Sequence, residues 1–103
     1  MPVAIIGARH VHVDADGFVT RFDDWDDEVA RRLAMAVGLE LTEERWRVIR
    51  ILREDYPRLG ETPSLLRVAM MAGMTVEQLG RLVPGQTART LAFVAGLPKP
   101  HGA

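Results

Sequence analysis

Glycine and proline divide residues 23–95 into short segments, and this spacing limits what the chain can fold into. Within the segments, apolar residues recur three or four positions apart, which is typical of amphipathic helices. Gly38, Gly60 and Gly73 follow three of the segments, where a helix commonly ends in a left-handed residue. We therefore expect about five short helices over residues 24–95.

The predicted helix starts share side-chain oxygens that can accept a hydrogen bond from a free backbone N–H. In chain order, the expected caps are Asp23 or Asp24, Thr42, Thr62 followed by Pro63, and Thr75 with Gln78 completing a capping box. On the second helix, the expected buried face holds Trp46, Ile49, Leu52 and Tyr56.

The two ends of the chain differ from this helical part. Alternating histidine and valine over residues 10–13, followed by Asp16-Gly17 and a second β-prone run, predict a hairpin over residues 10–20. Residues 3–6 could form a further short strand before it. After residue 95, two prolines favour an extended arm. The expected fold is mostly α with a small N-terminal β-hairpin (α+β): one domain over residues 1–95 and a C-terminal arm over residues 96–103.

No side-chain pattern predicts an enzyme site, a metal site or a cofactor. His10 and His12 share a strand face, but two histidines without further ligands indicate a polar surface. Ser64 has no histidine near it in sequence, and the acidic run over residues 23–28 suits a helix start. The chain has no cysteine, which excludes disulfides, thiolate metal sites and thiol nucleophiles.

Charge is distributed unevenly although the net charge is −1. Arg47, Arg50 and Arg53 are three apart on the predicted second helix and should face one way, either as a solvated face or as a surface for an anionic partner. The small net charge predicts no general attraction to nucleic acid or membranes. The chain shows no apolar run of about 18 residues and no signal-peptide pattern, so we expect a cytoplasmic protein.

Residues 62–83 resemble a helix-turn-helix, with Ala69 small where two helices would cross and Gly73 in the turn. In such a unit the second helix would enter the major groove of DNA. Against DNA binding, that helix offers only Gln78 and Arg81 to read bases, and Glu77 would repel phosphate. A helix pair formed for packing is the favoured interpretation, and a DNA-binding regulator stays open as an alternative.

Several motifs also occur together over residues 14–102. They are Asp16-Gly17-Phe18, Asp24-Trp25, Leu41-Thr42 with Trp46, Val48-Ile49, Leu52-Arg53 with Tyr56, Pro84-Gly85, and Gly96-Leu97-Pro98-Lys99-Pro100-His101-Gly102. With this ordered set the chain resembles the DsrC/TusE family of sulfur-relay proteins. The resemblance implies a small helical domain with an N-terminal hairpin and a mobile arm. It also implies that an arm cysteine carries sulfur as a persulfide, either to a tRNA-thiolating enzyme or for dissimilatory sulfite reductase.

The chain departs from the family at the atoms that would hold sulfur. Ala103 stands at the position of the carrier cysteine, and Ala92 at that of a second, upstream cysteine. A methyl group cannot ionise, attack a persulfide or hold a sulfane sulfur. We expect a non-catalytic binding or regulatory paralogue that acts on sulfur-relay partners. The alternatives are a Cys-to-Ala or truncated form of a sulfur carrier, for tRNA 2-thiouridine synthesis or dissimilatory sulfite reduction, and the helix-turn-helix regulator.

The expected partners are proteins of a sulfur-relay or sulfite-reductase system, with DNA as the partner in the regulator alternative. Contact with a protein partner is expected on the arm and on the basic face of the second helix. The residues are Leu97, Pro98, Lys99, Pro100, His101, Gly102, Arg47, Arg50 and Arg53.

Overall fold

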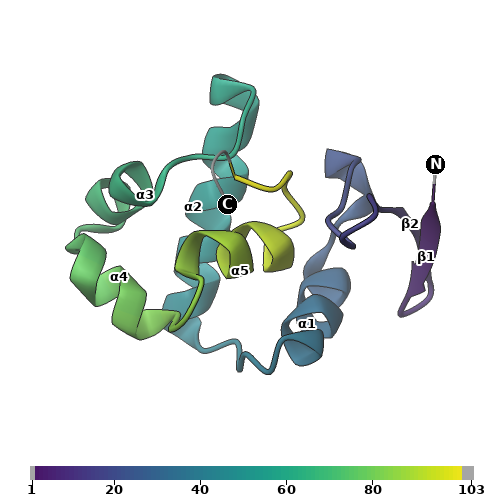
Figure 1. The fold of residues 1–103 in the computed structure, drawn as a ribbon, viewed down its shortest axis with the longest axis horizontal. Coiled ribbons are helices and arrows are strands. Elements are labelled where there is room, and N and C mark those ends of the chain that lie inside the picture. The colour runs from purple at the N-terminus through teal and green to yellow at the C-terminus, as the bar shows by residue number, and fades with distance from the viewer. Residues whose placement is uncertain (1, 101–103) are drawn as a thin grey trace.

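The computed structural model describes residues 2–100, drawn as a ribbon in Figure 1. Its elements are β1 (Val3–Ile6), β2 (Arg9–His12), a short 3₁₀ helix η1 (Phe22–Asp24), α1 (Asp27–Ala36), α2 (Glu43–Leu59), α3 (Leu65–Ala72), α4 (Val76–Leu82) and α5 (Thr87–Val94). The expected class, mostly α with a small N-terminal hairpin and five helices, is confirmed within this range. Three of the predicted contact and cysteine-position residues, His101, Gly102 and Ala103, lie outside the described residues.

The hairpin pairs different residues from those expected over residues 10–20. β1 and β2 are antiparallel and are joined through Gly7, whose φ of +63° suits glycine. The predicted pairing survives as an isolated bridge between Val13 and Val19. Asp14 explains the difference, because its carboxylate accepts two backbone N–H groups and closes a loop where we expected a tight hairpin turn. The register pairs Val3 with His12, Ala4 with Val11, Ile5 with His10 and Ile6 with Arg9.

Two of the predicted helix caps are wrong. α1 is capped by Asp26, because residues 22–24 form η1 and leave Asp23 and Asp24 one turn too early. α3 is capped by Ser64, and the hydroxyl of Thr62 is used elsewhere. In both helices the observed cap accepts a backbone N–H from the first turn.

The other predicted helix ends are confirmed. Thr42 caps α2, and Thr75 caps α4 in a complete capping box. Gly60 and Gly73 both have a φ of +72°, the left-handed geometry expected after α2 and α3.

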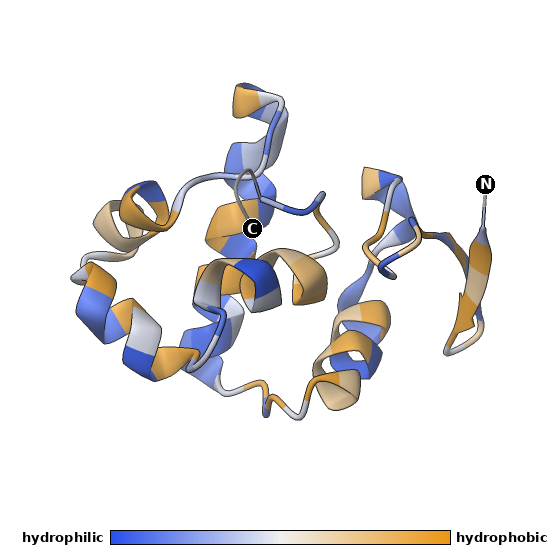
Figure 2. Cartoon of the chain, in the orientation of Figure 1, coloured by the Kyte–Doolittle hydropathy of each residue, from blue (hydrophilic) through white to orange (hydrophobic). Residues whose placement is uncertain are grey.

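The core forms around α2 and α5. Ile49 and Leu52 are buried as predicted, whereas Trp46 and Tyr56 are only half-buried at its edge. Figure 2 shows hydrophobic and hydrophilic residues mixed along each helix, as expected for amphipathic helices around a shared core. Within residues 2–100, no helix combines the length and apolar character that a membrane span requires.

Val48 and Asp55 are buried residues of α2 outside the predicted face, and Asp55 is the charged one. The Asp55 side chain is fully buried and bonds Arg67 of α3. The Arg67 guanidinium donates to both carboxylate oxygens, from Nε at 2.5 Å and from Nη2 at 2.9 Å. These bonds hold the pKa of Asp55 below its usual value and raise the pKa of Arg67. The pair fixes α3 against α2.

α3 and α4 form the expected helix pair, with Ala69 buried where the helices meet and Gly73 in the turn. The Gln78 amide oxygen accepts the backbone N–H of Thr75 to complete the α4 cap. One of the two side chains considered for reading DNA bases therefore has a structural partner.

Candidate functional site

The chain leaves α5 through a Schellman motif that sets the direction of the tail segment, defined here as residues 96–100. The Leu97 N–H donates to the Ala92 carbonyl at 3.0 Å, and the Gly96 N–H to the Phe93 carbonyl at 3.3 Å. The Leu97 side chain is fully buried and closes the motif against the core. The tail segment therefore starts from a fixed point.

Trp25 packs directly against this starting point. Its indole Nε1–H donates to the Val94 carbonyl at 2.9 Å. Gly96 has a φ of +69°, and a Cβ there would lie 2.3 Å from Trp25 Cδ1. Both the backbone conformation and the space therefore require glycine at this position.

Arg53, like Trp25, contacts the end of α5 where the tail segment begins. Its guanidinium donates to the Ala95 carbonyl at 3.1 Å and to the Phe22 carbonyl at 2.9 Å. Its central carbon lies 3.8 Å from the Phe22 ring centroid and 4.1 Å from that of Trp25. Burial among these groups lowers the pKa of Arg53 to about 10, so the side chain stays charged at neutral pH. Arg53 thus connects α2, η1 and the end of α5.

Beyond Leu97, two contacts hold the tail segment across the domain. The Thr62 hydroxyl donates to the Pro98 carbonyl at 2.6 Å, and Lys99 Nζ donates to the Asp16 carboxylate at 2.5 Å. The ion pair with Lys99 holds the pKa of Asp16 below its usual value. The loop after the hairpin and the segment before α3 therefore both contact the tail.

The predicted contact residues of the arm differ in their exposure to solvent. Leu97 faces the core, whereas Pro98 and Lys99 are exposed and Pro100 is half-buried. Ala92, which the resemblance to the family placed at the position of a second cysteine, is fully buried in α5. Its methyl group belongs to the core.

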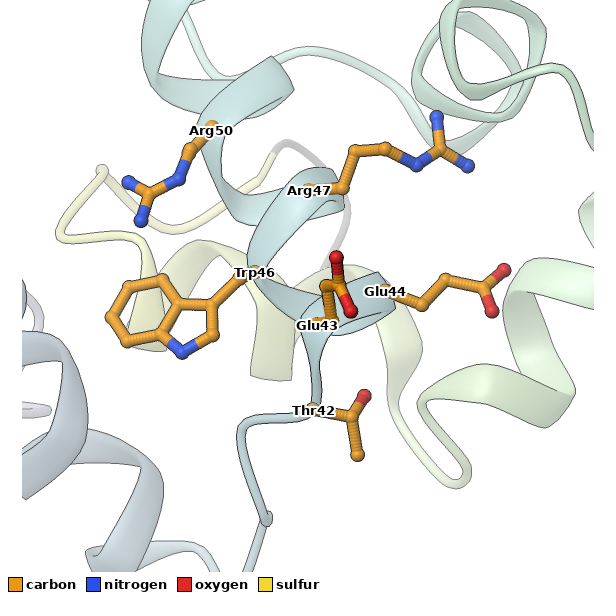
Figure 3. Close-up of a pocket in the computed structure, with 6 residues that line it drawn as sticks. All are labelled: Thr42, Glu43, Glu44, Trp46, Arg47 and Arg50. Atoms are coloured by element: carbon orange, nitrogen blue, oxygen red, sulfur yellow. The ribbon is translucent and has the colours of Figure 1, made fainter.

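The three predicted arginines do not form one face. Arg53 packs beneath the start of the tail, while Arg47 donates to the Ala72 carbonyl at 3.1 Å. The Arg50 guanidinium lies 4.9 Å from the Trp46 ring centroid. Figure 3 shows Arg47 and Arg50 extending to opposite sides of α2. The spacing by three predicted that the three arginines point the same way. They do not, because each contacts a different neighbouring group.

A surface hollow lies beside Trp46 at the start of α2 (Figure 3). The charged groups along it are two carboxylates, Glu43 and Glu44, and two guanidinium groups, Arg47 and Arg50. Their formal charges cancel, so the hollow has no net preference for an anion.

The two histidines of the hairpin have separate surroundings. His10 is exposed, whereas His12 Nδ1 lies 2.8 Å from an Asp24 carboxylate oxygen that also accepts the His12 backbone N–H. Over residues 2–100, no group of three or more histidine, aspartate or glutamate side chains is arranged to hold a metal ion. His12 instead ties the hairpin to η1.

Sequence reasoning missed the partners of the tail. Asp16 and Trp25 were noted as parts of motifs, and Thr62 as a helix cap, but not as contacts of the tail segment. Each is far from the tail in sequence, and local periodicity carries no signal for such contacts. The described residues form a small helical protein with its C-terminal segment docked across the domain.

Comparison with known proteins agrees with this architecture. The family model described as "DsrC like protein" matches residues 5–103. The sulfurtransferase TusE of Photorhabdus laumondii is 32% identical over 107 residues, covering 97% of this chain and 96% of the relative. The sulfurtransferase TusE of Yersinia pseudotuberculosis is 34% identical over 99 residues, covering 89% and 92%. The chain belongs to the DsrC/TusE family.

Solved structures support the same assignment. The solution structure of DsrC from Allochromatium vinosum matches with a TM-score of 0.85 and 30% identity, covering 98% of this chain and 96% of that one. The oxidized gamma subunit of the dissimilatory sulfite reductase (DsrC) from Archaeoglobus fulgidus matches with a TM-score of 0.81 and 29% identity, covering 99% of each chain. The family's fold is thus present in a chain without cysteine. The DNA-binding alternative gains no support from these matches.

Proposed function

We propose that this protein is a cysteine-free member of a sulfur relay, which binds the family's protein partners without carrying sulfur. One observation carries the proposal: the tail and its docking contacts with Thr62 and Asp16 are present, but the chain has no thiol. A covalent carrier needs a thiolate to attack the donor persulfide and to hold the transferred sulfur. Neither Ala92 nor Ala103 can supply one.

The proposed partner-binding surface is the exposed part of the tail. Pro98 and Lys99 present a short, restrained segment leading to His101 and Gly102, whereas Leu97 serves as its anchor in the core. Arg53 acts as a positioning residue by fixing the carbonyl of Ala95 just before the tail. A restrained segment loses less conformational entropy on binding, which favours recognition by a protein partner.

The relatives indicate the class of partner. They are named sulfurtransferase TusE and gamma subunit of the dissimilatory sulfite reductase. We accordingly propose a partner among the proteins of tRNA thiolation or of a sulfite reductase, within the cytoplasm. By occupying the carrier's docking position, the chain would compete with a cysteine-bearing relative and so regulate sulfur flow.

A binding assay tests this proposal. The full chain, a variant lacking residues 98–103 and the point variant Lys99→Ala are compared for capture of purified relay and sulfite-reductase components. Arg81→Ala, a charge removal on the exposed face of α4, is the matched control. We expect capture by the full chain and by the control, and weaker capture by the other two variants. Failure of the full chain to capture any component, or equal capture by the truncated variant, would contradict the proposal.

A second candidate is a sulfur carrier in which alanine replaces the working cysteine. The unbroken motif Gly96-Leu97-Pro98-Lys99-Pro100, leading to the carrier position, favours it. In Ala103→Cys, the new thiolate would attack the outer sulfur of a donor persulfide, forming an S–S bond and releasing the donor thiolate. A mass gain of one sulfur atom on that variant is expected if the carrier surface is retained, and no gain would contradict this candidate.

A further inference from the structure

Among residues 2–100, nothing pairs with the outer edge of the N-terminal sheet, which is therefore free in the described part of the chain. Its strand order is β1–β2, and β1 is the outer strand of the ribbon in Figure 1. An unpaired edge presents backbone N–H and C=O groups to any strand that can align with it. Proteins usually protect such an edge with charge, proline or a bulge. The four residues of β1, Val-Ala-Ile-Ile, carry none of these.

The pattern of hydrogen bonds between β1 and β2 shows which residues of β1 have backbone N–H and C=O groups at the free edge. The Val13 N–H donates to the Pro2 carbonyl, so these opposed residues form a hydrogen-bonded pair. Such pairs alternate along an antiparallel ladder, which places Ala4 and Ile6 in the bonds to β2. The backbone groups of Val3 and Ile5 therefore point away from β2.

The hydrogen bonds of His12, the residue opposite Val3, independently support this assignment of the ladder bonds. The His12 N–H donates to the Asp24 carboxylate at 2.9 Å, and the His12 carbonyl accepts the Thr20 N–H at 2.8 Å. Both backbone groups of His12 are thus used on the side of β2 away from β1. They are not directed at Val3.

The side chains of β1 also leave one face open. Ala4 and Ile6 pack on the cluster that includes Leu33 of α1. Val3 and Ile5 lie on the opposite face and are 47% and 72% exposed. The residues with free backbone groups are therefore also those with exposed aliphatic side chains.

We propose that β1 pairs in antiparallel register with β1 of a second copy of this chain. Val3 lies opposite Ile5 of the second copy, and a two-fold axis passes between the two Ala4 residues. This register opposes free N–H and C=O groups in hydrogen-bonded pairs and places aliphatic side chains together on one face. It joins the two hairpins into one four-stranded sheet.

A second copy suits this edge because the register is self-complementary. A two-fold contact of this kind uses the same surface on both copies and closes after two, so it forms no fibre. The strand carries no charge that would repel its own copy. Strands of four residues bury less than the roughly 1,200–2,000 Å² of a standard stable interface, so the dimer should dissociate on dilution.

Sedimentation and amide exchange of the full chain across a concentration series test the pairing. We expect a monomer–dimer equilibrium, with the Val3 and Ile5 amides gaining exchange protection as the dimer forms. The Ala4 and Ile6 amides should be protected at every concentration. A monomer at the highest soluble concentration, or protection of Val3 and Ile5 that appears only when a foreign protein is added, would overturn the proposal.

Two variants locate the interface. Ile5→Lys introduces charge on the free edge and should shift the equilibrium to monomer. Met70→Lys is the matched control, because Met70 on α3 is also 72% exposed and lies outside the sheet. If the dimer survives Ile5→Lys, or is lost in Met70→Lys, the contact between the two copies lies elsewhere and the proposed β1 pairing is refuted. A third variant, Ile5→Pro, removes the N–H that faces the free edge but no donor from the β1–β2 ladder, and should also yield monomer.

Discussion

The close packing of Trp25 against Gly96 allows a quantitative prediction for Gly96→Ala. Alanine in the left-handed conformation costs about 1–2 kcal/mol at a φ of +69°. In addition, the new Cβ would lie 2.3 Å from Trp25 Cδ1 and 2.8 Å from Trp25 Cγ, so the indole must move. Overpacking of this kind costs about 1–3 kcal/mol, and moving the indole also weakens its hydrogen bond to the Val94 carbonyl.

Gly38→Ala is the matched control for this variant. Gly38 has a φ of +70°, and a Cβ added there would meet no atom of residues 2–100 within 4 Å apart from its chain neighbours, so only the backbone cost applies. We expect Gly96→Ala to lower the free energy of unfolding by about 1–3 kcal/mol more than Gly38→Ala does. Urea denaturation followed by circular dichroism measures both values. Equal destabilisation by the two variants would refute the tight contact between Gly96 and Trp25.

Two further predictions concern the contacts that hold the helices and the tail. Trp25→Phe removes the indole N–H and leaves the Val94 carbonyl without its donor, which should lower the free energy of unfolding by about 1–3 kcal/mol; no loss in urea denaturation would contradict this. Arg67→Met should destabilise the fold more than Asp55→Asn at neutral pH, because it leaves a buried carboxylate without its hydrogen-bonded counter-charge. The pKa of Asp55 is lowered in the folded state, so the stability from this pair is complete above the ordinary carboxyl pKa of 3.8 and is lost as the pH falls through the folded value. The penalty of Arg67→Met should therefore shrink on acidification in thermal unfolding curves, and a penalty independent of pH would contradict the role given to Asp55.

The helix ends could be predicted because their signals are local. Thr42 and Thr75 cap helices through bonds to N–H groups three residues later, and Gly60 and Gly73 end helices through their own backbone conformation. The hairpin could not be predicted in the same way. Alternation over residues 10–13 indicates a strand but does not say which segment pairs with it.

The candidate site was predicted in part for a similar reason. The motif at the end of the chain identified the family and the tail, but not the contacts of the tail with Asp16 and Thr62, which join segments distant in sequence. Helical spacing also could not separate Arg53, enclosed by two aromatic rings, from Arg47 on the surface. Those differences depend on which elements pack against α2.

Sulfur transfer by a related sulfurtransferase tests the central claim most directly. The sulfurtransferase TusE of Photorhabdus laumondii would be loaded as a persulfide, and transfer to its acceptor protein followed while this chain is added in increasing amounts. We predict that the transfer rate falls with added chain while the mass of the chain stays unchanged. An unchanged transfer rate, or a gain of one sulfur atom by the chain itself, would contradict the account.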